Sequence, residues 1–169
     1  MHLPFGHVLS ILLILAPFSA SAAPRPVQLA PMQERAAELV IVAADGKEAR
    51  YSPDTLEEMP TYQLTTTTPW REKPANFEGI LLKDLLKAHG LHTASAIRVT
   101  AENDFTSIIQ RAVWEEVEIL VATRVNGKAH SRRARGPIQF VIDKSSYESS
   151  SNALEEHLVW MAARIEAVQ

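Results

Sequence analysis

Residues 77–90 read FEGILLKDLLKAHG and contain the clearest helical pattern in the chain. Leu82, Leu85 and Leu86 follow the i, i+3, i+4 spacing that gathers apolar side chains on one face of a helix. Gly90 stands where a glycine in the left-handed conformation commonly ends a helix. The sequence therefore predicts a helix within residues 77–90 whose apolar face packs against a core.

Short β-branched or alternating segments surround this helix on both sides. Two of them end at Asp45-Gly46 and Asn126-Gly127, dipeptides typical of two-residue hairpin turns. Ser52-Pro53 predicts the start of a short helical turn, because serine caps helices and proline suits their first position. Strands are predicted at residues 39–42, 62–68, 96–101, 119–125 and 138–142. Many short strands with few helices indicate an α+β fold that is mostly β.

The last segment of the chain fits two structures. Asn152 and Glu155 resemble the cap and third position of a helix, and good helix formers follow them. Residues 160–167 also alternate as a strand does. Propensity alone favours the helix.

Residues 1–23 have the pattern of an export signal. An apolar stretch from Val8 to Phe18 precedes Ala20-Ser21-Ala22, which fits the small-x-small cleavage pattern. We expect cleavage near Ala22 or Ala23 and a periplasmic location. The alternative is an uncleaved membrane anchor, but the apolar run is short for a span.

Residues 24–36 contain three prolines in a mixed sequence and predict a linker or mobile N-terminal arm. Residues 37–169 then form one domain, since a chain of this length holds a single core. The chain has no cysteine, which excludes disulfides and thiolate metal ligands and fits a bacterial periplasm. The net charge of -3 argues against a nucleic-acid partner.

Three groups of residues are candidates for ligand binding. Residues 65–70 place four threonine hydroxyls beside Trp70, although a plain strand end with a packed tryptophan would look the same. Residues 124–135 are rich in arginine, which suits phosphate and carboxylate groups, or they form a solvated charged loop. Asn103-Asp104 either forms an ordinary turn or contacts the amino-pyrimidine edge of a ligand. His89 and His92 have no third neighbour that would complete a metal site.

Taken in order, several segments resemble the oxidoreductase molybdopterin-binding domain, the fold of the sulfite oxidase family. The similarity extends over about residues 38–168. It rests on residues 65–70, 77–86, 90, 101–105, 120–127, 135–137, 159–160 and 164–165. The resemblance implies an α+β, mostly β fold, and it makes residues 160–165 a closing strand in place of a helix.

In the family's enzymes, a cysteine shortly after the strand that is here 62–68 ligates molybdenum. This chain has threonines there, with Thr66 nearest to that position. A neutral hydroxyl is a poor substitute for a soft thiolate. We therefore expect neither bound molybdenum nor another metal, no covalently bound cofactor and no enzymatic activity, while a pterin pocket remains.

The chain also looks like the shorter, cysteine-free periplasmic pterin-binding proteins. Some of those pair with a membrane protein that has a periplasmic receptor region and a cytoplasmic cyclic-di-GMP enzyme. The resemblance implies a non-catalytic pterin-binding module that regulates such a membrane partner. The alternatives are a molybdenum-cofactor oxidoreductase or its accessory subunit, and an interaction module without a ligand.

If the chain binds a pterin, each candidate residue has an expected role. Trp70 stacks on the ring, and Thr66, Thr67 and Thr68 hydrogen-bond its heteroatoms. Asn103 and Asp104 contact the amino-pyrimidine edge of the ring. Arg124 and Arg135 hold a polar tail of the ligand or order the pocket.

Overall fold

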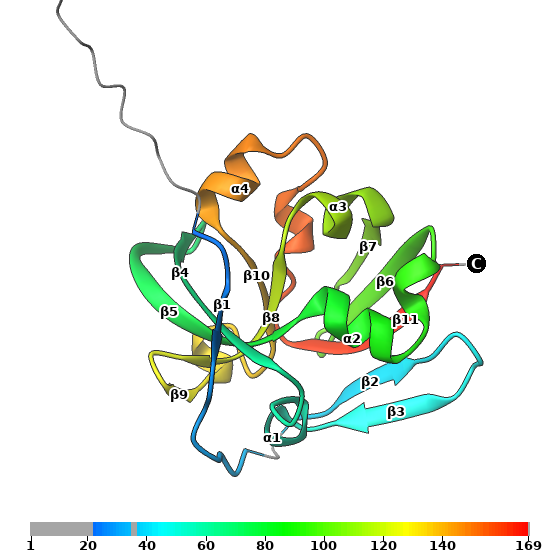
Figure 1. Ribbon diagram of the computed structural model, residues 1–169, viewed down its shortest axis with the longest axis horizontal. Helices are drawn as coiled ribbons and strands as arrows, with labels where there is room; N and C mark the ends of the chain where they lie inside the picture. Colours follow the sequence, from blue (N-terminus) through cyan, green and yellow to red (C-terminus); the bar gives the residue numbers. More distant parts are fainter. Residues whose placement is uncertain (1–21, 35–36, 169) are drawn as a thin grey trace, which may run out of the picture.

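The computed structural model describes residues 22–34 and 37–168. All but the last two residues of the expected export signal lie outside these ranges. The described residues form two sheets, which Figure 1 shows together with the helices that connect their strands. Among the described residues, the helices are too short or too polar to cross a bilayer.

The first sheet is antiparallel and has the order β1-β4-β5-β8-β10, with β9 paired to β8. Its strands are β1 (Arg25–Val27), β4 (Thr61–Thr68), β5 (Arg71–Leu81), β8 (Ile119–Val125), β9 (Lys128–Ala129) and β10 (Gln139–Ile142). We expected residues 24–36 to be a linker, but part of this segment is strand β1. The Thr61 hydroxyl donates to the Val27 carbonyl oxygen at 2.6 Å, which adds a side-chain bond to the pairing of β1 with β4.

The second sheet has the order β3-β2-β11-β6-β7. Its strands are β2 (Leu39–Val42), β3 (Glu48–Tyr51), β6 (Ala96–Ala101), β7 (Thr106–Gln110) and β11 (Ala162–Ala167). β11 runs parallel to β2 and antiparallel to β6. Residues 162–167 are therefore a central strand, as the family resemblance implied, and helix propensity is overridden by pairing on both sides.

The helices are short and connect the strands. They are α1 (Pro53–Leu56), α2 (Leu82–Ala88), α3 (Arg111–Glu116) and α4 (Lys144–Ser149), with single 3₁₀ turns η1 (Leu91–Thr93), η2 (Arg132–Ala134) and η3 (Glu155–His157). The helix predicted within residues 77–90 is α2, and residues 77–81 before it complete β5. A Cβ at Gly79 would lie 2.0 Å from the Val121 carbonyl oxygen, so this glycine allows β5 and β8 to approach closely. Gly90 follows α2 in the left-handed conformation, as expected.

The first sheet is apolar on both faces. Val121 and Phe140 pack into the larger core, which also contains the apolar face of α2 and the second sheet. Leu120 and Val141, one position along the same strands, belong to a smaller core on the opposite face. The continuous apolar runs of β8 and β10 follow from this two-sided burial. β5 pairs with β8 only over residues 77–81, so the part of the β4–β5 hairpin nearer its turn extends beyond this pairing.

Candidate functional site

The tip of the β4–β5 hairpin is the centre of the candidate site. β4 ends at Thr68 and β5 begins at Arg71, so Pro69 and Trp70 form the turn. Three cavities adjoin this turn, and Thr68, Trp70 or both line each of them. Trp70 is 36% exposed. The threonine and tryptophan stretch that the sequence singled out therefore lies at a solvent-accessible hairpin tip, and not inside the core.

The first cavity, which we call the basic cleft, has a volume of about 360 Å³. It is lined by Thr68, Trp70, Arg71, Phe77, Arg133, Ala134, Arg135 and Gln139. Among the residues that the structure describes, no carboxylate lies within 4.0 Å of its three arginines. A cleft with several guanidinium groups and no counter-charge attracts a negatively charged or carbonyl-rich ligand.

Arg135 lies between two indole rings at the edge of the basic cleft. Its Cζ is 4.5 Å from the Trp70 ring centroid and 4.9 Å from that of Trp160. The two rings are themselves 6.5 Å apart and tilted. Both distances are within the range of cation–π attraction, which holds the guanidinium and the rings together. We call Trp70, Arg135 and Trp160 the indole–arginine cluster.

Gln139, which lines the basic cleft, forms a buried amide–imidazole pair with His130 behind it. Gln139 Oε1 lies 2.8 Å from His130 Nε2, and both side chains are buried. Burial lowers the pKa of His130, so its ring is neutral at pH 7. A neutral ring that donates from Nε2 leaves Nδ1 as an acceptor, and this atom has no hydrogen-bond partner in the described structure. Gly136 allows the chain to pass this histidine, since a Cβ there would lie 2.2 Å from the His130 carbonyl oxygen.

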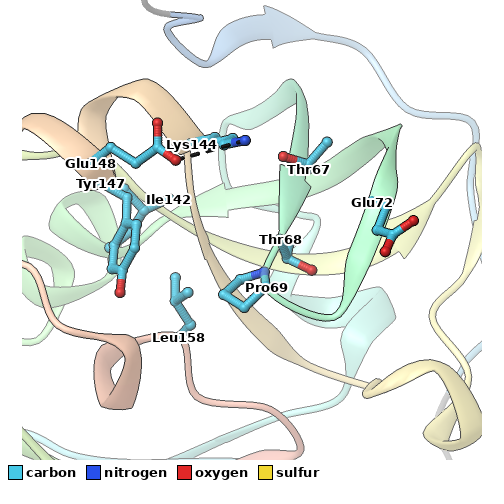
Figure 2. A pocket seen from close by; sticks show the side chains of 9 residues that line it. All are labelled: Thr67, Thr68, Pro69, Glu72, Ile142, Lys144, Tyr147, Glu148 and Leu158. Atoms are coloured by element: carbon cyan, nitrogen blue, oxygen red, sulfur yellow. Dashed lines mark ion pairs between the residues drawn. The ribbon is translucent and has the colours of Figure 1, made fainter.

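The second cavity, which we call the threonine cavity, lies on another side of the hairpin tip and has a volume of about 340 Å³. Figure 2 shows its lining, namely Thr67, Thr68, Pro69, Glu72, Ile142, Lys144, Tyr147, Glu148 and Leu158. Its single basic side chain, Lys144, lies 3.7 Å from the Glu148 carboxylate. The cavity therefore lacks the excess positive charge of the basic cleft.

Thr66 is buried beside the threonine cavity and is not among its lining residues. Its Oγ1 accepts a hydrogen bond of 2.9 Å from the Lys144 backbone nitrogen, which ties β4 to the first turn of α4. A hydroxyl in this position does not fit molybdenum held by a thiolate. The described residues also contain no group of three or more histidine, aspartate or glutamate side chains that could hold a metal ion.

The third cavity, which we call the apolar groove, has a volume of about 340 Å³ and is lined by Trp70, Asn103, Phe105, Glu155, Glu156, Leu158 and Trp160. Asn103 belongs to the turn between β6 and β7, where its Oδ1 accepts from the Phe105 nitrogen at 3.4 Å. Asp104 occupies the left-handed position of this turn and lines none of the three cavities. The asparagine and aspartate are thus turn formers, and Asn103 lies in a different cavity from Arg135.

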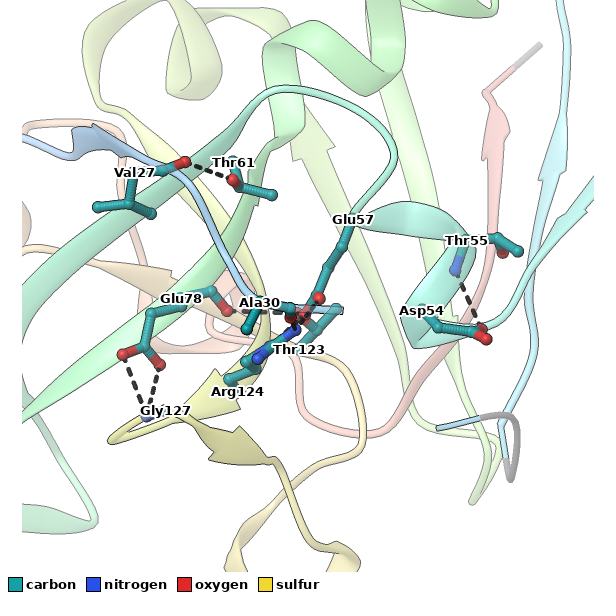
Figure 3. A network of polar contacts seen from close by, with 10 residues as sticks. All are labelled: Val27, Ala30, Asp54, Thr55, Glu57, Thr61, Glu78, Thr123, Arg124 and Gly127. Atoms are coloured by element: carbon teal, nitrogen blue, oxygen red, sulfur yellow. Dashed lines mark hydrogen bonds and ion pairs between the residues drawn. The ribbon is translucent and has the colours of Figure 1, made fainter. Parts of the chain in front are cut away.

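Arg124 does not join the candidate site. Figure 3 shows its guanidinium beside Glu57, with Nε 2.9 Å from Oε1 and Nη2 2.5 Å from Oε2. Nη2 also donates to the Ala30 carbonyl oxygen at 2.6 Å, and the Thr123 hydroxyl donates to Glu57 at 2.6 Å. The hydrogen bond to Glu57 raises the pKa of Arg124. This arginine is bound in a buried ion pair that joins β8 to the segment after α1.

The structure brings Thr68, Trp70 and Arg135 into one cleft and separates the other predicted residues. Sequence reasoning missed four further residues of the cleft or its rim, namely Arg71, Phe77, Gln139 and Trp160, and it included Arg133 only as part of the basic run. Two signals were available in the sequence. Arg71 follows Trp70 directly, and Arg133 belongs to the basic run. The role of Gln139 depends on the pairing of β10 with β8, which no local pattern specifies.

Comparison with known proteins identifies the fold. No family model and no curated protein matches the sequence. The crystal structure of the sulfane dehydrogenase SoxCD from Paracoccus pantotrophus is similar over 80% of this chain, with a TM-score of 0.57 and 12% sequence identity. The match covers 39% of the SoxCD chain, so this protein spans about two fifths of its length. The chain has a sulfite-oxidase-like fold of the α+β, mostly β class.

Proposed function

We propose that the protein is a non-catalytic periplasmic module that binds a reduced pterin in the basic cleft. We further propose that it regulates a membrane-bound signalling partner of a cyclic-di-GMP pathway. The observation that carries the ligand proposal is the exposed Trp70 ring at the rim of a cleft with three arginines and no carboxylate. An aromatic face beside convergent polar groups is the usual composition of a small-molecule site.

Each part of a pterin has a counterpart among the cleft residues. The flat ring suits the Trp70 face, and the Thr68 hydroxyl and Gln139 amide supply the donors and acceptors that its heteroatoms need. Arg71, Arg133 and Arg135 favour a pterin with a negatively charged substituent. The proposal leaves Arg124 out, because Glu57 and Ala30 occupy its donors.

The lack of catalysis in this proposal rests on the position of Thr66. The family's enzymes hold molybdenum through a cysteine at about this place, whereas the Thr66 hydroxyl bonds to the backbone of α4. Metal analysis of the purified protein tests this part. Molybdenum near one atom per chain would contradict the proposal and favour the oxidoreductase alternative.

The ligand proposal is tested by titration under anaerobic conditions. We expect the mature protein to bind a carboxylate-bearing tetrahydropterin with a Kd in the roughly micromolar range, measured by isothermal titration calorimetry. Trp70→Ala removes the stacking face, and we expect it to abolish detectable binding. Arg71→Ala and Arg133→Ala should each weaken binding about tenfold, since each removes a charge-assisted hydrogen bond.

The matched control is Arg98→Ala, which removes an arginine that pairs with Glu166 on the second sheet. We expect this variant to bind the tetrahydropterin as the unmodified protein does. No heat of binding with any tetrahydropterin, with or without a carboxylate, would contradict the proposal. Equal losses in Arg98→Ala and Arg133→Ala would show that the cleft is not the site.

A further inference from the structure

The apolar groove is lined by two of the three large exposed hydrophobic side chains of the described residues. In the described ranges these are Trp70, Phe105 and Leu154, and Phe105 and Leu154 are 42% and 53% exposed. Trp70 and Phe105 line the groove, and Leu154 directly precedes its lining residue Glu155. Scattered exposed hydrophobic residues are normal on soluble proteins, whereas their gathering at one groove marks an interaction site.

The backbone that presents these side chains is ordered by hydrogen bonds. The Ala101 nitrogen donates to the Phe105 carbonyl oxygen at 2.8 Å, which closes the turn between β6 and β7. The Leu154 nitrogen donates to His157 Nδ1 at 3.0 Å at the start of η3. Phe105 and Leu154 are therefore held in exposed positions, and a partner would lose little backbone entropy of this chain on binding them.

The rim of the groove carries carboxylates that form no ion pair with a described lysine or arginine. Glu155 and Glu156 line it, and Asp104 lies in the turn beside Phe105. In the described part of the chain, no lysine or arginine nitrogen lies within 4.0 Å of these three carboxylates. His157 Nε2 lies 4.0 Å from Glu156, but burial lowers the pKa of His157 and keeps its ring neutral near pH 7.

The basic cleft and the apolar groove therefore have opposite charge, and Trp70 lines both. We propose that the apolar groove docks a protein segment that has an apolar anchor flanked by lysine or arginine. Charge complementarity selects this occupant, because an acidic rim attracts basic flanks and repels both acidic segments and anionic lipid. In this proposal, the apolar groove is the surface on which the partner of the proposed function docks.

Trp70 also links the groove to the cleft. A ligand that stacks on Trp70 competes with or rearranges the indole–arginine cluster, and Trp70 and Trp160 of this cluster line the groove. Ligand and docked segment then alter each other's affinity by the same factor, since coupling between two sites is reciprocal. This coupling rests on the proposed ligand, whereas docking in the groove does not.

The test uses two fluorescein-labelled peptides and the full mature chain. The basic probe is Lys-Lys-Leu-Phe-Leu-Lys-Lys, and the acidic probe replaces every lysine with glutamate. We expect fluorescence anisotropy to show saturable binding of the basic probe and none of the acidic one. Phe105→Ser and the double variant E155K/E156K should each weaken binding of the basic probe at least tenfold. Circular dichroism confirms that these surface variants remain folded.

The matched control is E58K/E115K, which changes two exposed glutamates elsewhere and alters the net charge equally. We expect it to retain most of the affinity. An equal loss of affinity for the basic probe in both double variants would overturn the proposal. Binding would then depend on the net charge of the protein and not on the groove. Equal binding of both probes would also overturn it. Cosedimentation with phosphatidylglycerol vesicles that is abolished by Phe105→Ser would assign the groove to membrane and overturn it as well.

A final experiment tests docking in the groove separately from pterin binding in the cleft. Probe titrations are repeated with saturating tetrahydropterin under anaerobic conditions. A shift in probe affinity on pterin binding supports Trp70 as the shared wall. Pterin binding without a shift overturns that role of Trp70. Probe binding in a protein that binds no pterin supports the docking groove and contradicts the ligand proposal alone.

Discussion

At the scale of single residues, Arg124 and Glu57 form the clearest structural pair. Their side chains are 8% and 7% exposed. We expect Arg124→Ala to lower the free energy of unfolding by about 3–5 kcal/mol, because it leaves the Glu57 carboxylate buried without its partner. Urea denaturation followed by circular dichroism measures this change.

The control for this pair is Arg98→Ala, whose ion pair with Glu166 is more exposed. Exposed pairs contribute at most about 1 kcal/mol, so we expect a small loss in this variant. A loss in Arg124→Ala that is no larger than the loss in Arg98→Ala would contradict the structural role of Arg124.

Residue types alone could not separate Arg124 from Arg135. Both lie in one basic run, and the difference lies in their partners. Glu57 precedes Arg124 by 67 positions, and Trp70 and Trp160 flank Arg135 from both directions along the chain. The sequence could predict that the hairpin tip and the basic run bear on function. Which arginine faces solvent depends on long-range contacts that local patterns do not encode.

At the scale of elements, the junction of β5 and α2 shows why the sequence did not locate the first residue of the helix within residues 77–90. Residues 77–81 are apolar enough for a strand buried on both faces, and the helical spacing of the leucines begins only at Leu82. Periodicity alone cannot locate such a boundary. Gly79 was the available signal, because a glycine within an apolar run often marks a close approach of two backbones.

The close approach at Gly79 gives a testable prediction. We expect Gly79→Ala to lower the free energy of unfolding by about 3 kcal/mol, because the new Cβ would meet the Val121 carbonyl oxygen on β8. Gly46→Ala serves as the control. It has no atom within 4 Å but has a φ of +81°, so we expect a loss of about 1 kcal/mol. A loss in Gly79→Ala that is no larger than the loss in Gly46→Ala would contradict a severe contact between the new Cβ and β8.

At the scale of the whole molecule, the sequence predicted most strands but not their arrangement. β11 comes last in the chain and lies between β2 and β6. Its position is set by pairing with β2, which precedes it by more than 120 residues, and with β6, which precedes it by more than 60 residues. The candidate site depends on the same assembly, since the indole–arginine cluster joins the β4–β5 tip to residues just before β11. Resemblance to a known fold, and not local propensity, predicted that closing strand.

Buried histidines make the stability of the whole domain depend on pH. Burial lowers the pKa of the buried His130 and His157, and of the half-buried His89, below the ordinary value of 6.5. The unfolded chain therefore binds more protons than the folded chain once the pH falls below about 6.5, and stability decreases there. Each histidine contributes a slope of at most about 1.4 kcal/mol per pH unit. The shifted carboxylates, Asp45, Glu48, Glu116 and Glu166, titrate only at lower pH.

We therefore expect the free energy of unfolding in urea to be lower at pH 5.5 than at pH 7.5. The variant His130→Gln should show a smaller difference between the two pH values, because the group that titrates in the unfolded chain is gone. His92→Gln, at an exposed position, should keep the difference of the unmodified protein. Equal stability of the unmodified protein at both pH values would contradict the assignment of neutral, buried histidines. An unchanged difference in His130→Gln would assign the pH dependence to His89 and His157 alone.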